Sequence, residues 1–120
     1  MFLKLLRAKI HRATVTEAEV DYIGSITIDR DLIDRSGIMP FEEVLVADLD
    51  NAARFRTYVI EGPRGSGTIC VNGAAAKLVN VGDRIIIMAF AFVSPQEAAE
   101  LKPKIVLVDG KNRPVKDLPS

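Results

Sequence analysis

Alternation of apolar and polar residues along the chain predicts a mainly β protein. The order Ala8-Lys9-Ile10-His11 has a period of two, and we expect a long strand from Leu5 to Val15 with one basic face. Further strands are predicted at residues 26–29, 43–49, 55–60, 68–71, 84–93 and 104–108. Turns rich in Gly, Asn and Asp separate most of these segments. Many short strands joined in this way are typical of a compact barrel or sandwich.

Short helices are predicted by capping residues. Asp29 or Asp31 can cap a helix that ends at Gly37. Residues 94–97 read Ser-Pro-Gln-Glu, a capping box with Pro at the first helical position, and predict a helix as far as residue 101. Residues 72–78 predict a single helical turn or a tight loop. We expect the chain beyond Gly110 to be frayed or loosely packed.

Composition narrows the classes of function. The 120 residues carry 16 basic and 16 acidic side chains, so a zero net charge gives no electrostatic case for binding nucleic acid or an anionic membrane. The single Cys70 cannot form an intrachain disulfide and is expected in the core, and the single His11 excludes a multi-histidine metal site. We expect neither a signal peptide nor a membrane-spanning segment, because no apolar run of the required length occurs in these residues. We expect one domain over residues 1–120, in a soluble cytoplasmic protein without a metal.

Candidate chemistry centres on Gly24-Ser25, directly before the predicted strand at residues 26–29. Glycine leaves its carbonyl carbon unshielded and tolerates strained backbone angles, while serine places a hydroxyl beside that carbonyl. The same pair is also common in ordinary turns. The pair is therefore a candidate self-cleavage site whose interpretation depends on the rest of the chain.

Five other side chains have both a chemical and a structural interpretation. Lys9, Arg54 and Arg56 can each hold a carboxylate, although basic residues on strands are usually just solvated. Thr57 and Tyr58 fall in a predicted strand, where β-branched and aromatic side chains are favoured for packing alone. None of the five identifies a function by itself.

Several separated motifs favour the chemical interpretation over the structural one, because they occur together and in a fixed order. They are Lys9–Thr16, Tyr22–Ser25, Arg54–Tyr58, Arg64–Gly67, Val71–Ala76 and Val81–Asp83. This arrangement resembles the family of pyruvoyl-dependent aspartate 1-decarboxylases over nearly the whole chain. The resemblance implies a six-stranded double-psi β-barrel with short flanking helices. It also implies a homotetramer with active sites between subunits.

The resemblance implies that the chain makes its own cofactor. Ser25 would attack the Gly24 carbonyl, with Thr57 similar to the residue that assists this step in the family. The chain would separate into a β chain of residues 1–24 and an α chain of residues 25–120, and Ser25 would become a pyruvoyl group. Its ketone would form a Schiff base with the substrate amine, so neither PLP nor a metal is expected.

The implied reaction removes the α-carboxylate of L-aspartate as CO2 and gives β-alanine, which in the family feeds pantothenate and coenzyme A synthesis. Lys9 and Arg54 resemble the residues that pair with the two substrate carboxylates, in either order. Tyr58 resembles the general acid that reprotonates the α-carbon. The residues that would position the substrate and the pyruvoyl group are Thr57, Asn72, Gly73, Ala74 and Ala75.

Two alternatives remain open on the sequence. The first is a non-catalytic barrel that serves as a binding module, because a fold alone does not assign a function. The second is a pyruvoyl decarboxylase of another acidic amino acid such as glutamate, since one methylene group changes binding by only about 1–3 kcal/mol.

Overall fold

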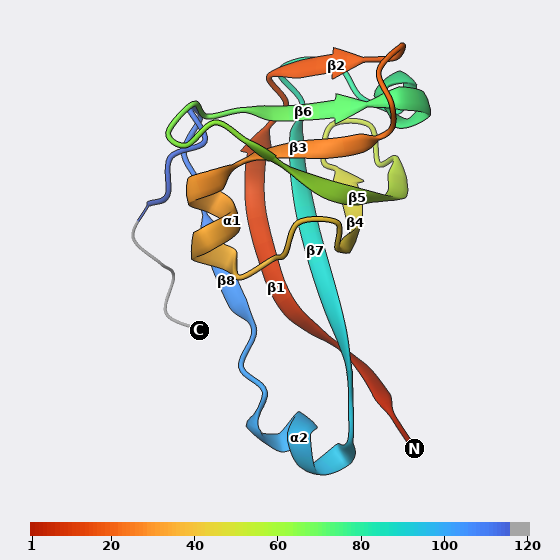
Figure 1. Ribbon diagram of the computed structural model, residues 1–120, viewed down its shortest axis with the longest axis vertical. Coiled ribbons are helices and arrows are strands. Elements are labelled where there is room, and N and C mark those ends of the chain that lie inside the picture. Colours follow the sequence, from red (N-terminus) through yellow and green to blue (C-terminus); the bar gives the residue numbers. More distant parts are fainter. Residues whose placement is uncertain (116–120) are drawn as a thin grey trace.

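Eight strands and three short helices make up the fold of the described part of the chain, which is residues 1–115 of a computed structural model (Figure 1). The elements are β1 (Leu3–Thr14), β2 (Glu17–Glu19), β3 (Ser25–Asp29), α1 (Arg30–Ser36), β4 (Glu43–Asp48), β5 (Arg54–Gly62), β6 (Ile69–Asn72), the 3-10 helix η1 (Gly73–Leu78), β7 (Arg84–Val93), α2 (Pro95–Glu100) and β8 (Lys104–Leu107). The predicted mainly β fold with short helices is confirmed.

The strands form one sheet in the order β2-β6-β3-β5-β4-β7-β1-β8. The sheet closes because β2 follows β1 after only two residues and pairs with β6 at the opposite end of this order. At the junction, the Thr16 backbone N–H donates to the Ile69 carbonyl at 2.8 Å. With β1 and β2 counted as one interrupted strand, six strands surround the core, and β8 adds to β1 by parallel pairing.

Isoleucine and valine fill the interior of this barrel. Fully buried side chains alternate along β3 at Ile26 and Ile28 and along β7 at Ile85 and Ile87. A chain without tryptophan therefore builds its core from β-branched residues, which fit the pleated inner surface of a sheet.

The strand β1 carries the predicted basic face, and it contains an irregularity that the periodicity does not reveal. Its register against β7 shifts between His11 and Ala13, where Arg12 has a positive φ of 68°. This bulge reverses the alternation, so Ala13 is buried like Ile10 instead of continuing the outer face.

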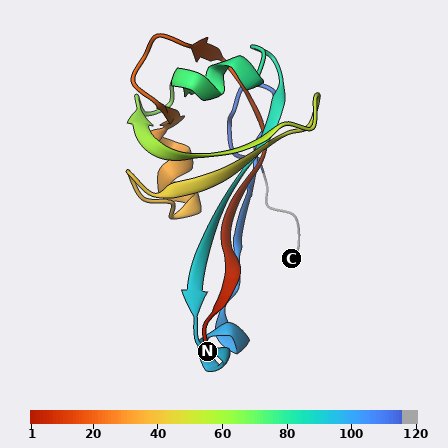
Figure 2. The same cartoon turned by 90° about the vertical axis from the view of Figure 1, so that its right-hand side faces the viewer.

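The strands β1, β7 and β8 continue beyond the barrel as an arm with α2 at its tip (Figures 1 and 2). The arm makes the molecule elongated, with extents of 43 × 30 × 25 Å. Large apolar side chains are exposed on it, including Phe2 and Phe92, which are 73% and 74% exposed.

The predicted helix ends are confirmed. Asp29 caps α1 by accepting a hydrogen bond from the Asp31 backbone N–H at 2.8 Å, and Gly37 ends the helix with a φ of 77°. Ser94 and Glu97 form the expected capping box of α2.

The expectation of a frayed segment after Gly110 is wrong for residues 111–114. Asn112 is buried, and its side chain contacts residues far away in the sequence: it accepts from the Thr14 backbone N–H at 2.7 Å and donates to the carbonyls of Thr14 and Gly67 at 2.8 Å each. Val108 and Pro114 also form an isolated bridge. The predicted loose end at residues 118–120 lies outside the described residues.

Among residues 1–115, no helix has the length and apolar character that a membrane crossing requires.

Candidate active site

Ser25 is the first residue of β3 and lies between β5 and β6. Its backbone is opposite Asn72 in the antiparallel pair β3–β6, while the next residue, Ile26, is opposite Val59 in the parallel pair β3–β5. The serine is only 1% exposed and has a φ of 112°, a region that L-residues rarely adopt. A buried hydroxyl beside a strained backbone is thus placed directly after Gly24.

The side chain of Asn72 holds the Ser25 hydroxyl in place. Its Nδ2 donates to Ser25 Oγ at 3.0 Å and to Thr27 Oγ1 at 3.1 Å. Its Oδ1 accepts from Cys70 Sγ at 3.2 Å. Both N–H groups of the amide therefore donate to side chains of β3, and these bonds fix the orientation of the amide.

Gly24 and Gly73 approach each other closely. Gly73 has a φ of 73°, and a Cβ atom added to it would lie 2.8 Å from the Gly24 Cα and 3.4 Å from the Tyr22 carbonyl oxygen. Only glycine at position 73 leaves room for the segment that carries the Gly24 carbonyl.

Tyr58 approaches the same segment from β5, and Thr57 is its neighbour on that strand. Tyr58 directly precedes Val59, the first β5 residue that pairs with β3, whereas Thr57 lies opposite Val44 of β4. The Tyr58 ring lies near Gly24, because a Cβ atom built on that glycine would be 4.0 Å from the Tyr58 Cε1. Tyr58 is 37% exposed and Thr57 is half-buried, so their side chains meet solvent at the rim of the site.

The small residues Ala74 and Ala75 form the first turn of η1, directly after Gly73. Ala74 is exposed and Ala75 is half-buried. Gly73 before them is buried, so the turn is open to solvent mainly at Ala74, whose side chain is small.

The structure does not bring Lys9 and Arg54 to Ser25 within one chain. Lys9 lies on β1 between β7 and β8, opposite Met88 and Ile105. Arg54 begins β5, on the same outer face as Tyr58 but four residues away, or roughly 13 Å along a strand. The described chain therefore gathers Ser25, Asn72, Gly73 and Tyr58 around Gly24 and leaves Lys9 and Arg54 apart from them.

The half-buried His11 shares the outer face of β1 with Lys9. Burial lowers its pKa, and the charges of Lys9 and Arg12 lower it further. Its Nδ1 is buried and has no hydrogen-bond partner within residues 1–115. The imidazole therefore stays neutral near pH 7 and adds no third positive charge beside Lys9.

Sequence reasoning missed the polar contact of Cys70. It predicted a small core residue, and the side chain is indeed buried, but its thiol also bonds to Asn72. The contact could have been predicted from the sequence, because Cys70 and Asn72 are two residues apart on one strand and therefore share a face of β6.

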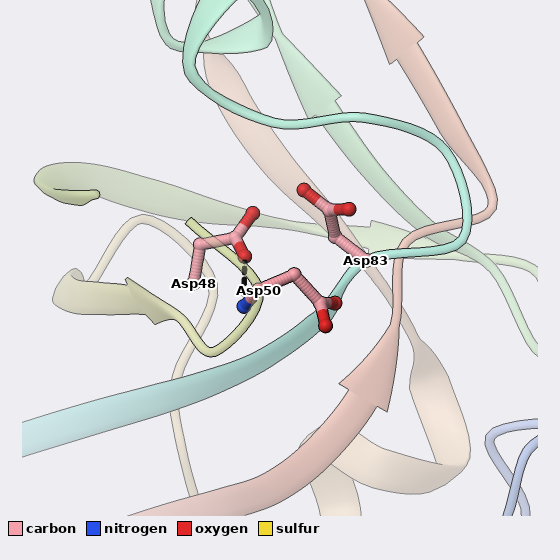
Figure 3. Close-up of side chains that lie close together, drawn as sticks. All are labelled: Asp48, Asp50 and Asp83. Carbon is pink, nitrogen blue, oxygen red and sulfur yellow. Dashed lines mark hydrogen bonds between the residues drawn. The ribbon is translucent and has the colours of Figure 1, made fainter. Parts of the chain in front are cut away.

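A separate cluster of three carboxylates lies at the opposite end of β4 from Glu43 (Figure 3). Oxygen atoms of Asp48, Asp50 and Asp83 come within 4.8 Å of one another. Asp48 Oδ1 accepts from the Asp50 backbone N–H at 2.8 Å, whereas Asp48 Oδ2 is buried without a donor among residues 1–115. Burial raises the pKa of Asp48, and so does hydrogen bonding with Asp83, whose own pKa is lowered by the same contact. A proton on Asp48 Oδ2 would let this oxygen donate to Asp83, in agreement with the opposite directions of the two pKa shifts.

The family model and three similar proteins that match this chain all carry the same name, aspartate decarboxylase or aspartate 1-decarboxylase. Residues 1–115 match the family described as aspartate decarboxylase. The aspartate 1-decarboxylase of Lactiplantibacillus plantarum is 56% identical over 113 residues, which are 94% of this chain and 87% of that protein. The proteins of the same name from Carboxydothermus hydrogenoformans and Chloroherpeton thalassium are 55% and 58% identical over 116 residues, which are 97% of this chain and 91% and 85% of theirs.

Among solved structures, the rationally designed protein mkDPBB_sym_86 matches with a TM-score of 0.47 and 18% sequence identity. The match covers 66% of this chain and 91% of the designed chain.

Proposed function

The chain belongs to the aspartate decarboxylase family, and on this premise we propose that it converts L-aspartate to β-alanine and CO2 with a pyruvoyl group formed from its own Ser25. The observation that carries the proposal is the buried Ser25 at a φ of 112°, with its hydroxyl held by Asn72 directly after Gly24. A binding module has no need for a strained, buried serine of this kind.

The first step of maturation is an acyl shift at the bond between Gly24 and Ser25. The Ser25 Oγ bonds to the Gly24 carbonyl carbon, the C–N bond breaks, and the hydroxyl proton passes to the Ser25 nitrogen. The strained φ of Ser25 favours this step, because it is relieved when the peptide becomes an ester. Thr57, two residues before Val59 on the strand that pairs with β3, is the proposed donor to the developing oxyanion.

Elimination then breaks the ester and divides the chain. The Ser25 Cα loses a proton to water, the Cβ–Oγ bond breaks, and residues 1–24 leave with a carboxylate on Gly24. Hydrolysis of the resulting dehydroalanine releases ammonia and leaves the pyruvoyl group at the start of residues 25–120. The single domain over residues 1–120 thus becomes a β chain of residues 1–24 and an α chain of residues 25–120.

The residues around Ser25 fit a small covalent group. Gly73 brings backbone against Gly24, and Ala74 and Ala75 follow with little bulk. A pyruvoyl group at residue 25 would supply a carbonyl that binds the substrate amine and an acceptor for the electrons of decarboxylation. Neither PLP nor a metal is required for this chemistry.

The other side chains bind the substrate and move a proton. Lys9 and Arg54 pair with the two carboxylates of L-aspartate, which balances the charge of the bound dianion. Thr57, Asn72 and the backbone of residues 73–75 orient the substrate. Tyr58 donates a proton to the α-carbon after CO2 leaves, and the nearness of its ring to Gly24 supports this role.

We also propose a homotetramer with active sites between subunits. Within one chain, Lys9 and Arg54 lie away from Ser25, so a neighbouring subunit is needed to complete the set of charges. The exposed Phe2 and Phe92 supply apolar surface for such contacts. A cytoplasmic location agrees with β-alanine as a precursor of pantothenate and coenzyme A.

Intact mass under denaturing conditions tests the proposal, with borohydride treatment alongside. We expect fragments of residues 1–24 and 25–120, the second reducible by borohydride and without a free amine. Ser25→Ala should give one uncleaved, inactive chain. Decarboxylation by purified Ser25→Ala would contradict the pyruvoyl mechanism, and a wild-type chain that stays intact after prolonged warm incubation would favour a binding module.

Turnover of L-aspartate and L-glutamate by the same preparation separates the two substrate assignments. We expect kcat/KM for aspartate to exceed that for glutamate by about 10-fold or more, which is the discrimination that one methylene group usually gives.

A further inference from the structure

The orientation of the Asn72 amide depends on a residue outside the proposed machinery. We infer that Cys70 is a positioning residue for self-cleavage: its thiol donates to Asn72 Oδ1 and thereby turns the amide N–H groups toward Ser25. The inference rests on the proposed function, because it concerns how the Ser25 hydroxyl is prepared for that reaction.

The thiol is built into the strand next to the cleavage site. Cys70 is 7% exposed and lies on β6 opposite Thr27 of β3. Burial raises the pKa of its thiol, with the charges of Glu17 and Glu19 adding to the effect. The group therefore keeps its proton at neutral pH and is available as a donor.

Among the side-chain partners of Asn72 within residues 1–115, only the thiol distinguishes the two ends of its amide. The hydroxyls of Ser25 and Thr27 can each donate or accept, so they are satisfied whichever end faces them. Sulfur is a weak acceptor, and a distance of 3.2 Å to Asn72 Oδ1 fits a thiol that donates. Rotating the amide by half a turn would replace this bond by an N–H directed at a poor acceptor. Cys70 thus selects the arrangement with Nδ2 toward β3.

The orientation of the Asn72 amide affects both reactions of Ser25 Oγ, which are the acyl shift and the elimination. With Nδ2 as donor, the Ser25 hydroxyl keeps its own proton free to pass to the backbone nitrogen during the acyl shift. During elimination, Oγ takes the electron pair of the Cβ–Oγ bond and becomes part of the Gly24 carboxylate, which an N–H donor stabilises. An amide oxygen in the same place would oppose that charge.

The test compares Cys70→Ser, which keeps a donor, with Cys70→Ala, which removes it. The readout is the rate constant of cleavage, followed by denaturing mass spectrometry from freshly made full-length chain. We expect Cys70→Ser to cleave within about threefold of the wild type. Cys70→Ala should cleave about fivefold to tenfold more slowly, the value of one net hydrogen bond of about 1 kcal/mol.

A control variant separates positioning from stability. Ile85→Val removes a methyl group from the core on β7, a strand that pairs with β1 and β4 and not with β3 or β6, and should lower the unfolding midpoint while cleaving at the wild-type rate. Unfolding midpoints are measured for all variants with Ser25→Ala added, so that every chain is compared uncleaved.

The outcomes are distinct. Equal cleavage rates for Cys70→Ala and the wild type would overturn the inference and leave the proposed function standing. The same slow rate for Cys70→Ser and Cys70→Ala would also overturn it, because packing and not the donor would then be responsible. A wild-type chain that never cleaves would overturn both.

Discussion

Gly73 and Gly24 lie in direct backbone contact, so that a Cβ atom on Gly73 would stand 2.8 Å from the Gly24 Cα and 3.1 Å from its nitrogen. The positive φ of Gly73 adds a second barrier to any side chain there. The position of the Gly24 carbonyl therefore depends on a residue 49 positions later in the sequence.

Gly73→Ala should slow cleavage by about 10-fold or more, because the new methyl group displaces Gly24 from Ser25 Oγ. The fraction of cleaved chain on a denaturing gel measures this effect. Gly37→Ala is the matched control: its φ of 77° imposes similar strain, but nothing lies within 4 Å of the new atom. Equal slowing in both variants would contradict a steric effect on Gly24.

Tyr58→Phe should mature normally and turn over poorly. The proposed role of the Tyr58 hydroxyl is to reprotonate the α-carbon, and loss of a general acid lowers kcat by about 100-fold or more. Release of CO2 from L-aspartate measures this, together with the cleaved fraction. Tyr22→Phe removes a hydroxyl from an exposed ring and should keep its activity. A Tyr58→Phe enzyme as fast as the wild type would remove Tyr58 from the mechanism.

The elements of the fold could be predicted because their signals are local. The cap at Asp29 and the capping box at Ser94 involve neighbours within three residues, and alternation marks the strands directly. The bulge at Arg12 could not be predicted, since it only becomes visible when β1 is paired with β7.

The contacts that hold the site together, and those that hold the segment after Gly110, join residues far apart in the sequence. Asn112 reaches Thr14 across 98 positions, and Asn72 reaches Ser25 across 47. A polar residue in a segment without periodicity looks like a surface residue unless its partner is known, which explains the wrong prediction for the tail. The roles of Lys9 and Arg54 stay predictions, because one chain does not bring them to Ser25.

Asn112→Ala should lower the free energy of unfolding by about 3 kcal/mol. It leaves the Thr14 backbone N–H without its acceptor and adds strain at a φ of 60°. Asn112→Gly tolerates that φ and should recover only about 1 kcal/mol, so the comparison isolates the amide. Urea unfolding of both, in the Ser25→Ala background, is the measurement. Two variants as stable as the parent would show that the tail is not held by this side chain.

Asp48→Asn should stabilise the protein by about 1 kcal/mol at pH 7.5, because an amide nitrogen supplies the donor that Asp48 otherwise needs a proton to provide. The pKa of Asp48 is raised in the folded state, so the folded chain keeps a proton that the unfolded chain has lost. Stability from this group therefore falls as the pH rises from the ordinary aspartate range through the raised pKa.

Urea midpoints across pH 3.5–7.5 check this dependence, again with Ser25→Ala added. The advantage of Asp48→Asn should grow with pH and then level off above the raised pKa. Asp50→Asn is the control, because Asp50 is exposed and already accepts from the Arg84 backbone N–H at 2.8 Å. An advantage that shrinks as the pH rises would contradict a proton held on Asp48.

The bond proposed to be cut lies after two strands that remain fixed in the sheet. Residues 1–24 contain β1, which is paired on both sides with β7 and β8, and β2, which is paired with β6. The short fragment would therefore stay in the barrel after cleavage, held without a covalent link. The protein would fold as one uncut chain and then function as two fragments. Once unfolded, the two separate fragments could not refold as the uncut chain did, so the lifetime of the mature protein would depend on its rate of unfolding.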